Sequence, residues 1–246
     1  MRREGFPESG NAIVMPISST RRNASAGLED TFKPMASSTL HEEIYDEICL
    51  ALRDGRLLPG QNVGIRQLAD AVNTSPMPVR EALRRLEAQG VLKTRPGRVL
   101  SIPGLDINEV NEIYTIRVNL EGLAAERAAS ESTQSEMAEV QMICDKMDKF
   151  VAFQDSRTFY PLNYEFHMAI YRAAHMPHLL RIIQPLWLRI SPFLWSIANE
   201  PHLRFAMEQH HQAVAALFKR DAAGLRLAIE NDILRAQKML TTILQK

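Results

Sequence analysis

The feature that most constrains the fold is the run from Ser75 to Leu86, which combines a helix start with a two-faced helix body. Serine is a favoured N-cap because its hydroxyl can accept a hydrogen bond from a free amide of the first turn. Prolines at positions 76 and 78 fall in that turn, where a missing amide hydrogen costs little. Apolar residues then recur at the spacing of one buried helix face, namely Val79, Ala82, Leu83 and Leu86. The pattern predicts a short helix with one side in a core.

The other side of this helix carries positive charge. Arg80 and Arg84 lie one turn apart on a second face, with Met77 roughly a turn before Arg80. An apolar back and an arginine front suit the major groove of DNA, where arginine reads guanine or holds phosphate. The alternative is a surface helix with a solvated charge stripe.

Charge is unevenly distributed along the chain. The formal net charge of the 246 residues is zero, which excludes a uniformly basic nucleic-acid coat. From Val79 to Arg98, however, six basic residues stand against two acidic ones, and a local basic stripe is typical of phosphate contacts. Length and a hydrophobic content of 46% favour two globular domains.

The cysteines and the lack of long apolar segments indicate in which cellular compartment the protein works. The two cysteines, Cys49 and Cys144, are far apart in helical patterns, which favours a reducing cytosol over a disulfide scaffold. We expect neither a transmembrane helix nor a secretory signal, because no apolar stretch is long enough and the N-terminus has no apolar core. Together these features predict a cytoplasmic protein.

The order of elements predicts a mainly α chain that begins with a winged helix-turn-helix. Residues 1–38 have the composition of a disordered tail. Within a domain at 39–104 we expect three helices and a β-hairpin. The predicted segments are a helix from Leu40 that ends at Gly55, helices at 65–72 and 75–89, strands at 91–94 and 99–102, and a turn at 95–98.

This domain resembles the DNA-binding domain of the GntR family of bacterial transcription regulators. The motifs are Gly55…Leu58-Pro-Gly60, Leu68-Ala69, Pro78-Val-Arg-Glu-Ala-Leu83, Leu86-Glu87 and Gly90-Val91. The resemblance implies operator contacts from Arg66, Ser75, Met77, Arg80 and, at the tip of the wing, Gly97. Two positions depart from the family: Pro76 replaces a common arginine, and Gly64 replaces the usual cap of the second helix. We expect Arg84, Arg95 and Arg98 to add contacts.

Residues 105–246 have helical periodicity almost throughout and predict an all-helical bundle of about six or seven helices. They resemble the FCD domain, which defines the FadR subgroup of the same family and which binds effectors and dimerises. The motifs are Tyr114-x-x-Arg117-x-x-Leu-Glu121, Asn163-x-x-Phe-His167 and Glu208-Gln-His210 with Asp221.

The resemblance also implies a divalent metal inside the bundle. By position, its ligands are Asn163, His167, His210 and Asp232, although the family usually has aspartate at the first position and histidine at the last. Two imidazoles and one carboxylate suit Zn²⁺, or Mn²⁺ or Ni²⁺ with water completing the shell. The alternative is a metal-free pocket with hydrogen-bonded core histidines.

Arg117 is the remaining candidate site residue. An arginine on an apolar helix face needs a partner, and the resemblance implies that it holds a carboxylate of the effector. The alternative is a surface arginine paired with Glu121.

The sequence therefore predicts a homodimeric transcription regulator, more often a repressor in this family, rather than an enzyme. Its expected partners are a palindromic double-stranded operator in the bacterial nucleoid and a small organic acid. A ligand-blind architectural DNA-binding protein is one alternative. Another is a metallohydrolase built on His167, His210 and Asp232, although His-Glu-x-x-His, Gly-x-Ser-x-Gly and phosphate-loop motifs are all absent.

Overall fold

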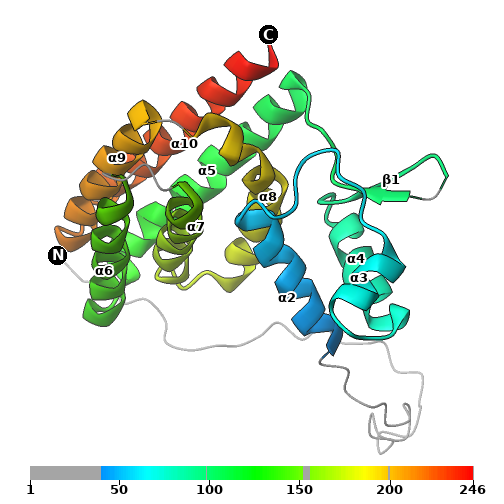
Figure 1. Ribbon diagram of the computed structural model, residues 1–246. Coiled ribbons are helices and arrows are strands. Elements are labelled where there is room, and N and C mark those ends of the chain that lie inside the picture. Colours follow the sequence, from blue (N-terminus) through cyan, green and yellow to red (C-terminus); the bar gives the residue numbers. More distant parts are fainter. Residues whose placement is uncertain (1–39, 98, 152–155, 199, 246) are drawn as a thin grey trace, which may run out of the picture. The chain divides into compact units, whose positions relative to one another are not determined.

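The first three helices that the structure describes follow the predicted apolar spacing. The computed structural model describes residues 40–97, 99–151, 156–198 and 200–245, so the predicted tail lies outside the described residues (Figure 1). Helix α2 spans Leu40–Arg53, α3 spans Ile65–Ala71 and α4 spans Pro76–Ala88. The four apolar residues predicted for α4 are all buried, and α4 packs against α2 and α3.

The connections between these helices use residues that tolerate unusual backbone angles. Gly55, two residues beyond the end of α2, and Asn73, between α3 and α4, have φ of +73° and +51°, in the left-handed region that glycine and asparagine enter most readily. Gly64 is the N-cap of α3. Ser75 is the N-cap of α4 with an extended backbone, but its side chain makes no capping hydrogen bond, so that part of the prediction is wrong.

The wing is shorter than predicted. Strand β1, Lys93–Arg95, pairs antiparallel with β2, Val99–Ser101. Val91 and Leu92 are 2% and 1% exposed, so they belong to the core rather than to a strand with one solvated face. Arg95 ends β1 instead of lying in the turn, and Gly97 has φ +85° there. Helices and hairpin together form the predicted winged helix-turn-helix (Figure 1).

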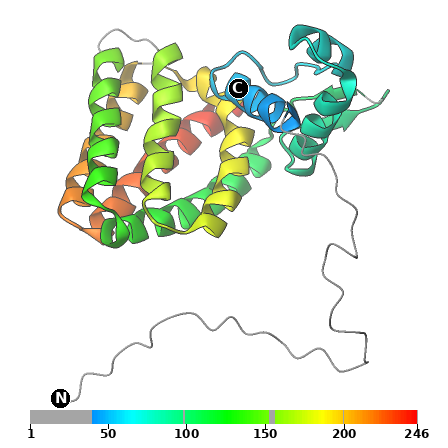
Figure 2. The ribbon, with the colours of Figure 1, turned by 90° about the horizontal axis from the view of Figure 1, so that it is seen from below.

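Helices alone, and no strand, make up the described part of the C-terminal half, as the periodicity predicts. Its elements are α5 (Ile107–Glu131), α6 (Gln134–Val151), α7 (Ser156–Arg172), α8 (Pro177–Leu194), a 3₁₀ turn (Trp195–Ile197), α9 (Glu200–Phe218) and α10 (Ala222–Leu244). The side chain of Gln237 on α10 donates to Asn111 on α5 at 2.9 Å, and that of Arg226 donates to Glu126 at 2.8 Å. These pairs show that α10 runs antiparallel along α5 (Figure 2).

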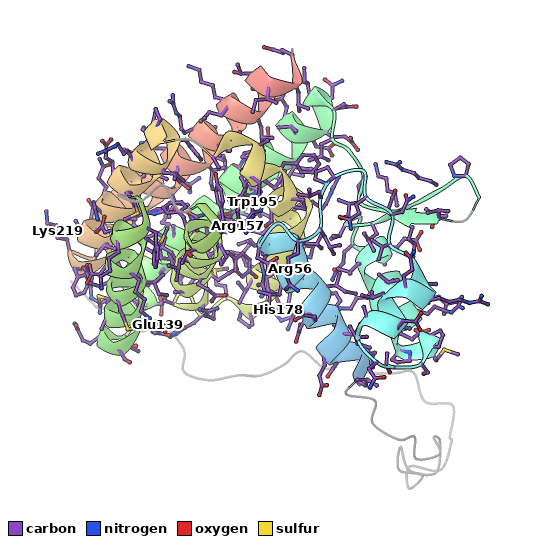
Figure 3. The ribbon with its side chains drawn as sticks, viewed as in Figure 1. Arg56, Glu139, Arg157, His178, Trp195 and Lys219 are labelled. Atoms are coloured by element: carbon purple, nitrogen blue, oxygen red, sulfur yellow. The ribbon has the colours of Figure 1, made fainter. Side chains whose placement is uncertain are left out.

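The interior of this bundle contains polar side chains as well as apolar ones. Labelled charged residues such as Glu139 and Lys219 lie on its outside (Figure 3). Six of the buried polar residues come from four helices, and these are Arg117 and Glu121 on α5, Asn163 and His167 on α7, His210 on α9 and Asp232 on α10. Buried charge is costly unless it is paired, so this cluster is a candidate functional site. Within the described residues, none of the helices is long and apolar enough to cross a membrane.

Candidate DNA-binding surface and metal-binding cavity

Two of the predicted DNA-contacting arginines share one surface hollow. Arg66, in the first turn of α3, and Arg80, in α4, line a depression of about 500 Å³ together with Pro76 and the wing residues Val99 and Leu100. Both arginine side chains are exposed. Three elements that are separate in sequence therefore line one hollow, and two of them, α3 and α4, present an arginine to it, as a winged helix needs for contacts with groove and phosphate.

The other predicted DNA-contacting residues differ in their exposure and in whether their charge is paired. Ser75 and Met77 are exposed at the start of α4, and Met77 is 65% exposed. Arg84 donates to Glu81 at 3.0 Å, so part of its charge is balanced. Arg95 is exposed and Gly97 has open space around its α-carbon. Arg98 lies outside the described residues.

The basic stripe from Val79 to Arg98 is weaker than its composition indicates. The guanidinium carbon of Arg85 lies 3.8 Å from the ring centre of Tyr45 on α2. Lys93 pairs with Glu109 at 3.0 Å. Glu109 balances part of the charge of Lys93, and Arg80 and Arg95 are the described members of the stripe with neither an ion pair nor a ring contact.

In the bundle, three of the four predicted metal ligands converge. Nε2 of His167 lies 3.2 Å from Oδ2 of Asp232, and Nε2 of His210 lies 3.9 Å from Oδ1. One ligand atom from each residue falls within 4.8 Å of the others. Tetrahedral ligands about 2.1 Å from Zn²⁺ lie about 3.4 Å from one another, so small side-chain movements bring all three atoms onto one ion.

The protonation states also suit a metal. Burial lowers the pKa of His210 to about 3, so its imidazole is neutral. Burial alone would raise the pKa of Asp232, but the surrounding imidazoles, that of His167 first, hold it at about 2. A neutral imidazole and an ionised carboxylate are the metal-binding forms. Among the described residues, neither ring nitrogen of His210 has a hydrogen-bond partner, unlike the core histidines of the metal-free alternative.

A small cavity adjoins these residues. Arg117, Asn163 and Asp232 are among its lining residues, and its volume is about 20 Å³, enough for about one water molecule. Tyr160 also lines it, and its hydroxyl is buried without a hydrogen-bond partner among the described residues. Sequence reasoning missed Tyr160, although it lies one helical turn before Asn163 on the same face.

Arg117 takes part in a buried ion pair. Its Nε donates to Oε1 of Glu121 at 2.6 Å, and the two side chains are 3% and 0% exposed. The guanidinium carbon also lies 5.0 Å and 4.4 Å from the ring centres of Tyr114 and Trp187. The pairing considered in the sequence analysis therefore exists, but in the core rather than on the surface, and Arg117 still lines the cavity.

Together, an exposed arginine-bearing winged helix and a helical bundle with a polar cavity define a DNA-binding transcription regulator. The sequence profile of bacterial regulatory proteins of the gntR family matches residues 40–101, and that of the FCD domain matches residues 112–235. The chain belongs to the GntR family, in the group that carries an FCD domain.

Individual relatives agree with this assignment. The chain is 31% identical over 195 residues to the HTH-type transcriptional regulator McbR of Escherichia coli, with 78% of this chain and 88% of McbR covered. It is 30% identical over 190 residues to a probable D-xylose utilization operon transcriptional repressor of Paenarthrobacter nicotinovorans, covering 77% and 84% of the two chains. The solved structure of E. coli McbR/YncC has a TM-score of 0.77 at 29% identity over 85% of this chain and 99% of that one.

Proposed function

We propose that this chain is a homodimeric repressor whose affinity for a palindromic operator changes when a metal ion and a small organic acid bind in the FCD domain. The P. nicotinovorans relative is a probable transcriptional repressor, which supports repression. Two winged domains related by a twofold axis read two half-sites of a palindrome. We expect the protein to act on the nucleoid in the cytoplasm and to catalyse no reaction.

The observation that carries the metal proposal is His210, whose fully buried ring makes no hydrogen bond among the described residues and faces the carboxylate of Asp232. Buried polar groups are normally satisfied, and a cation bound between His167, His210 and Asp232 satisfies all three. Zn²⁺, Mn²⁺ or Ni²⁺ fits two imidazoles and a carboxylate, with Asn163 beside them as a weaker oxygen donor. Such an ion supplies a Lewis-acid site for an oxygen of the effector.

The cavity supports an organic acid as the effector. Arg117 lines it, but Glu121 accepts hydrogen bonds from its Nε and Nη2, so the effector must share this arginine. Because a volume of about 20 Å³ holds about one water molecule, an acid of several heavy atoms must push the walls apart. Binding therefore favours a different packing of the bundle, which is how a ligand shifts a conformational equilibrium.

The first experiment measures the metal content of the purified full chain by elemental mass spectrometry, before and after chelation. We expect about one transition metal per chain, lost in Asp232→Ala because one of the three ligands is removed. Asp148→Ala is the matched control, since Asp148 also faces a histidine, His211, at 2.9 Å but on the surface. Equal metal content in Asp232→Ala and the unaltered protein contradicts this site.

A further inference from the structure

A chain of buried hydrogen bonds runs from Arg117 through Glu121 and Tyr171 to the metal-ligand candidate His167. Arg117 and Trp187 both donate to Glu121, the latter from Nε1 to Oε2 at 2.9 Å. The hydroxyl of Tyr171 lies 2.6 Å from the same Oε2 and 3.1 Å from Nδ1 of His167. All of these side chains are at most 3% exposed.

The direction of each hydrogen bond follows from the chemistry of the groups. An ionised carboxylate only accepts, so the Tyr171 hydroxyl donates its single hydrogen to Glu121. The oxygen of Tyr171 can then only accept from His167, which requires the hydrogen of the imidazole to lie on Nδ1. Nε2, 3.2 Å from the carboxylate of Asp232, is then the nitrogen left to bind a metal ion between the two side chains.

We propose that Glu121 and Tyr171 are positioning residues that hold His167 in the tautomer whose Nε2 binds the metal. The inference rests on the proposed metal site and extends it to an outer shell. Hydrogen bonds of this kind fix ring orientation and make the ligand more basic. Arg117 contributes by pairing with Glu121 in the core, since a buried carboxylate without a partner is strongly disfavoured.

The two histidines of the site are therefore not equivalent. Nδ1 of His167 has Tyr171 as its partner, whereas Nδ1 of His210 has none among the described residues. The hydrogen bond to Tyr171 holds His167 in the tautomer that binds a metal through Nε2 before the ion arrives. No such bond selects a tautomer of His210, so its tautomer is fixed only when the ion binds. His167 is the better organised of the two ligands.

The test compares zinc affinity of the full chain, measured by competition with a chelating dye, for Tyr171→Phe and Tyr114→Phe. Tyr171→Phe removes the link to His167 and leaves the Arg117–Glu121 pair in place. We expect its zinc affinity to fall by about 10- to 100-fold. Tyr114→Phe is the matched control because its buried hydroxyl lies near Arg117 but donates to neither Glu121 nor His167, so its zinc affinity should be unchanged. Equal zinc affinity in Tyr171→Phe and the unaltered protein overturns the proposal.

A second measurement needs no variant and separates the two proposals. Long-range proton–nitrogen NMR spectra of the unaltered metal-free chain should show a slowly exchanging hydrogen on Nδ1 of His167, because Tyr171 accepts it in the core. A hydrogen on Nε2 alone overturns the positioning role whether or not zinc binds. If the hydrogen is on Nδ1 but zinc does not bind, the hydrogen-bond chain is correct and the metal site is wrong.

Discussion

At the scale of single residues, the arginines of α4 differ in how much charge they can offer to DNA. Arg80 is exposed, lines the hollow beside Arg66 and makes no ion pair with a described residue. Arg84, one turn later, is held by Glu81. Two residues that look alike in sequence are therefore expected to contribute unequally to operator binding.

Replacing Arg80 with alanine should weaken operator binding by about 1–3 kcal/mol, with loss of discrimination at one base position if the side chain reads a base. Arg84→Ala should weaken operator binding by less, because Arg84 must give up its bond to Glu81 before it can contact DNA. Fluorescence anisotropy with a site selected from random DNA measures both. Arg127→Ala, an exposed arginine paired with Glu131 on α5, controls for the loss of one charge. Unchanged affinity in Arg80→Ala would refute the assignment of α4 as the recognition helix.

The sequence predicted the members of the buried site but not the contacts between them. His167, His210 and Asp232 were inferred from a resemblance and from spacing, and the structure brings them together, although their role in metal binding is still a prediction. Tyr171 and Trp187 lie 50 and 66 residues from Glu121, and no local pattern connects them. Their hydrogen bonds depend on how α5, α7 and α8 pack, which periodicity does not specify.

At the scale of elements, helices were easier to predict than the wing. The repeat of apolar residues gives α2, α3 and α4 to within one or two residues, because each buries a single face. The same apolar signal placed the start of β1 too early, because Val91 and Leu92 are buried in the core and do not belong to the strand. Short apolar runs do not distinguish a strand from a buried connection.

The start of α6 offers a pH-dependent prediction. Glu136 accepts from the amide and hydroxyl of Thr133 and pairs with His175 at 2.8 Å. The backbone hydrogen bond of Thr133, followed by those of His175 and the Thr133 hydroxyl, lowers the pKa of Glu136 to about 2. A lowered carboxyl pKa stabilises the fold above its ordinary value of about 4.3, and this contribution is lost as the pH falls toward 2.

Glu136→Gln should therefore lower the free energy of unfolding by about 0.5–1 kcal/mol at pH 7, as expected for the loss of a helix cap. The difference should shrink between pH 4.5 and pH 3. Urea unfolding at each pH measures it. Glu139→Gln, one turn later with a looser pair to Arg172 at 3.6 Å, should have little effect at any pH. A Glu136→Gln difference that stays constant with pH would place the stabilisation outside the carboxylate charge.

At the scale of the whole molecule, the charge balance of the cavity couples its two proposed ligands. Arg117 and Glu121 neutralise each other, which leaves the charge of Asp232 uncompensated by these residues. An anion entering the cavity without a metal would meet that carboxylate in a poorly solvated interior, where like charges repel strongly. A divalent ion reverses the sign, so the metal rather than Arg117 makes the cavity attractive to an acid.

Metal and organic acid should accordingly bind with positive coupling. We expect removal of the metal to weaken binding of a small hydroxy-carboxylate, chosen from a thermal-shift screen of the zinc-loaded chain, by at least about tenfold. Linkage then requires the acid to tighten zinc binding by the same factor.

Calorimetric titrations of the chelated and zinc-loaded chain measure both affinities. The uncharged amide of the same acid is the control, and its affinity should depend much less on zinc. Equal affinity of the acid with and without metal would move the anion contact to Arg117 and require Glu121 to give way. Operator affinity is then measured with and without zinc, each with and without the acid. A change in operator affinity shows that ligand binding in the bundle affects the winged domain, because an effector alters DNA affinity only by preferring one packing of the bundle over another.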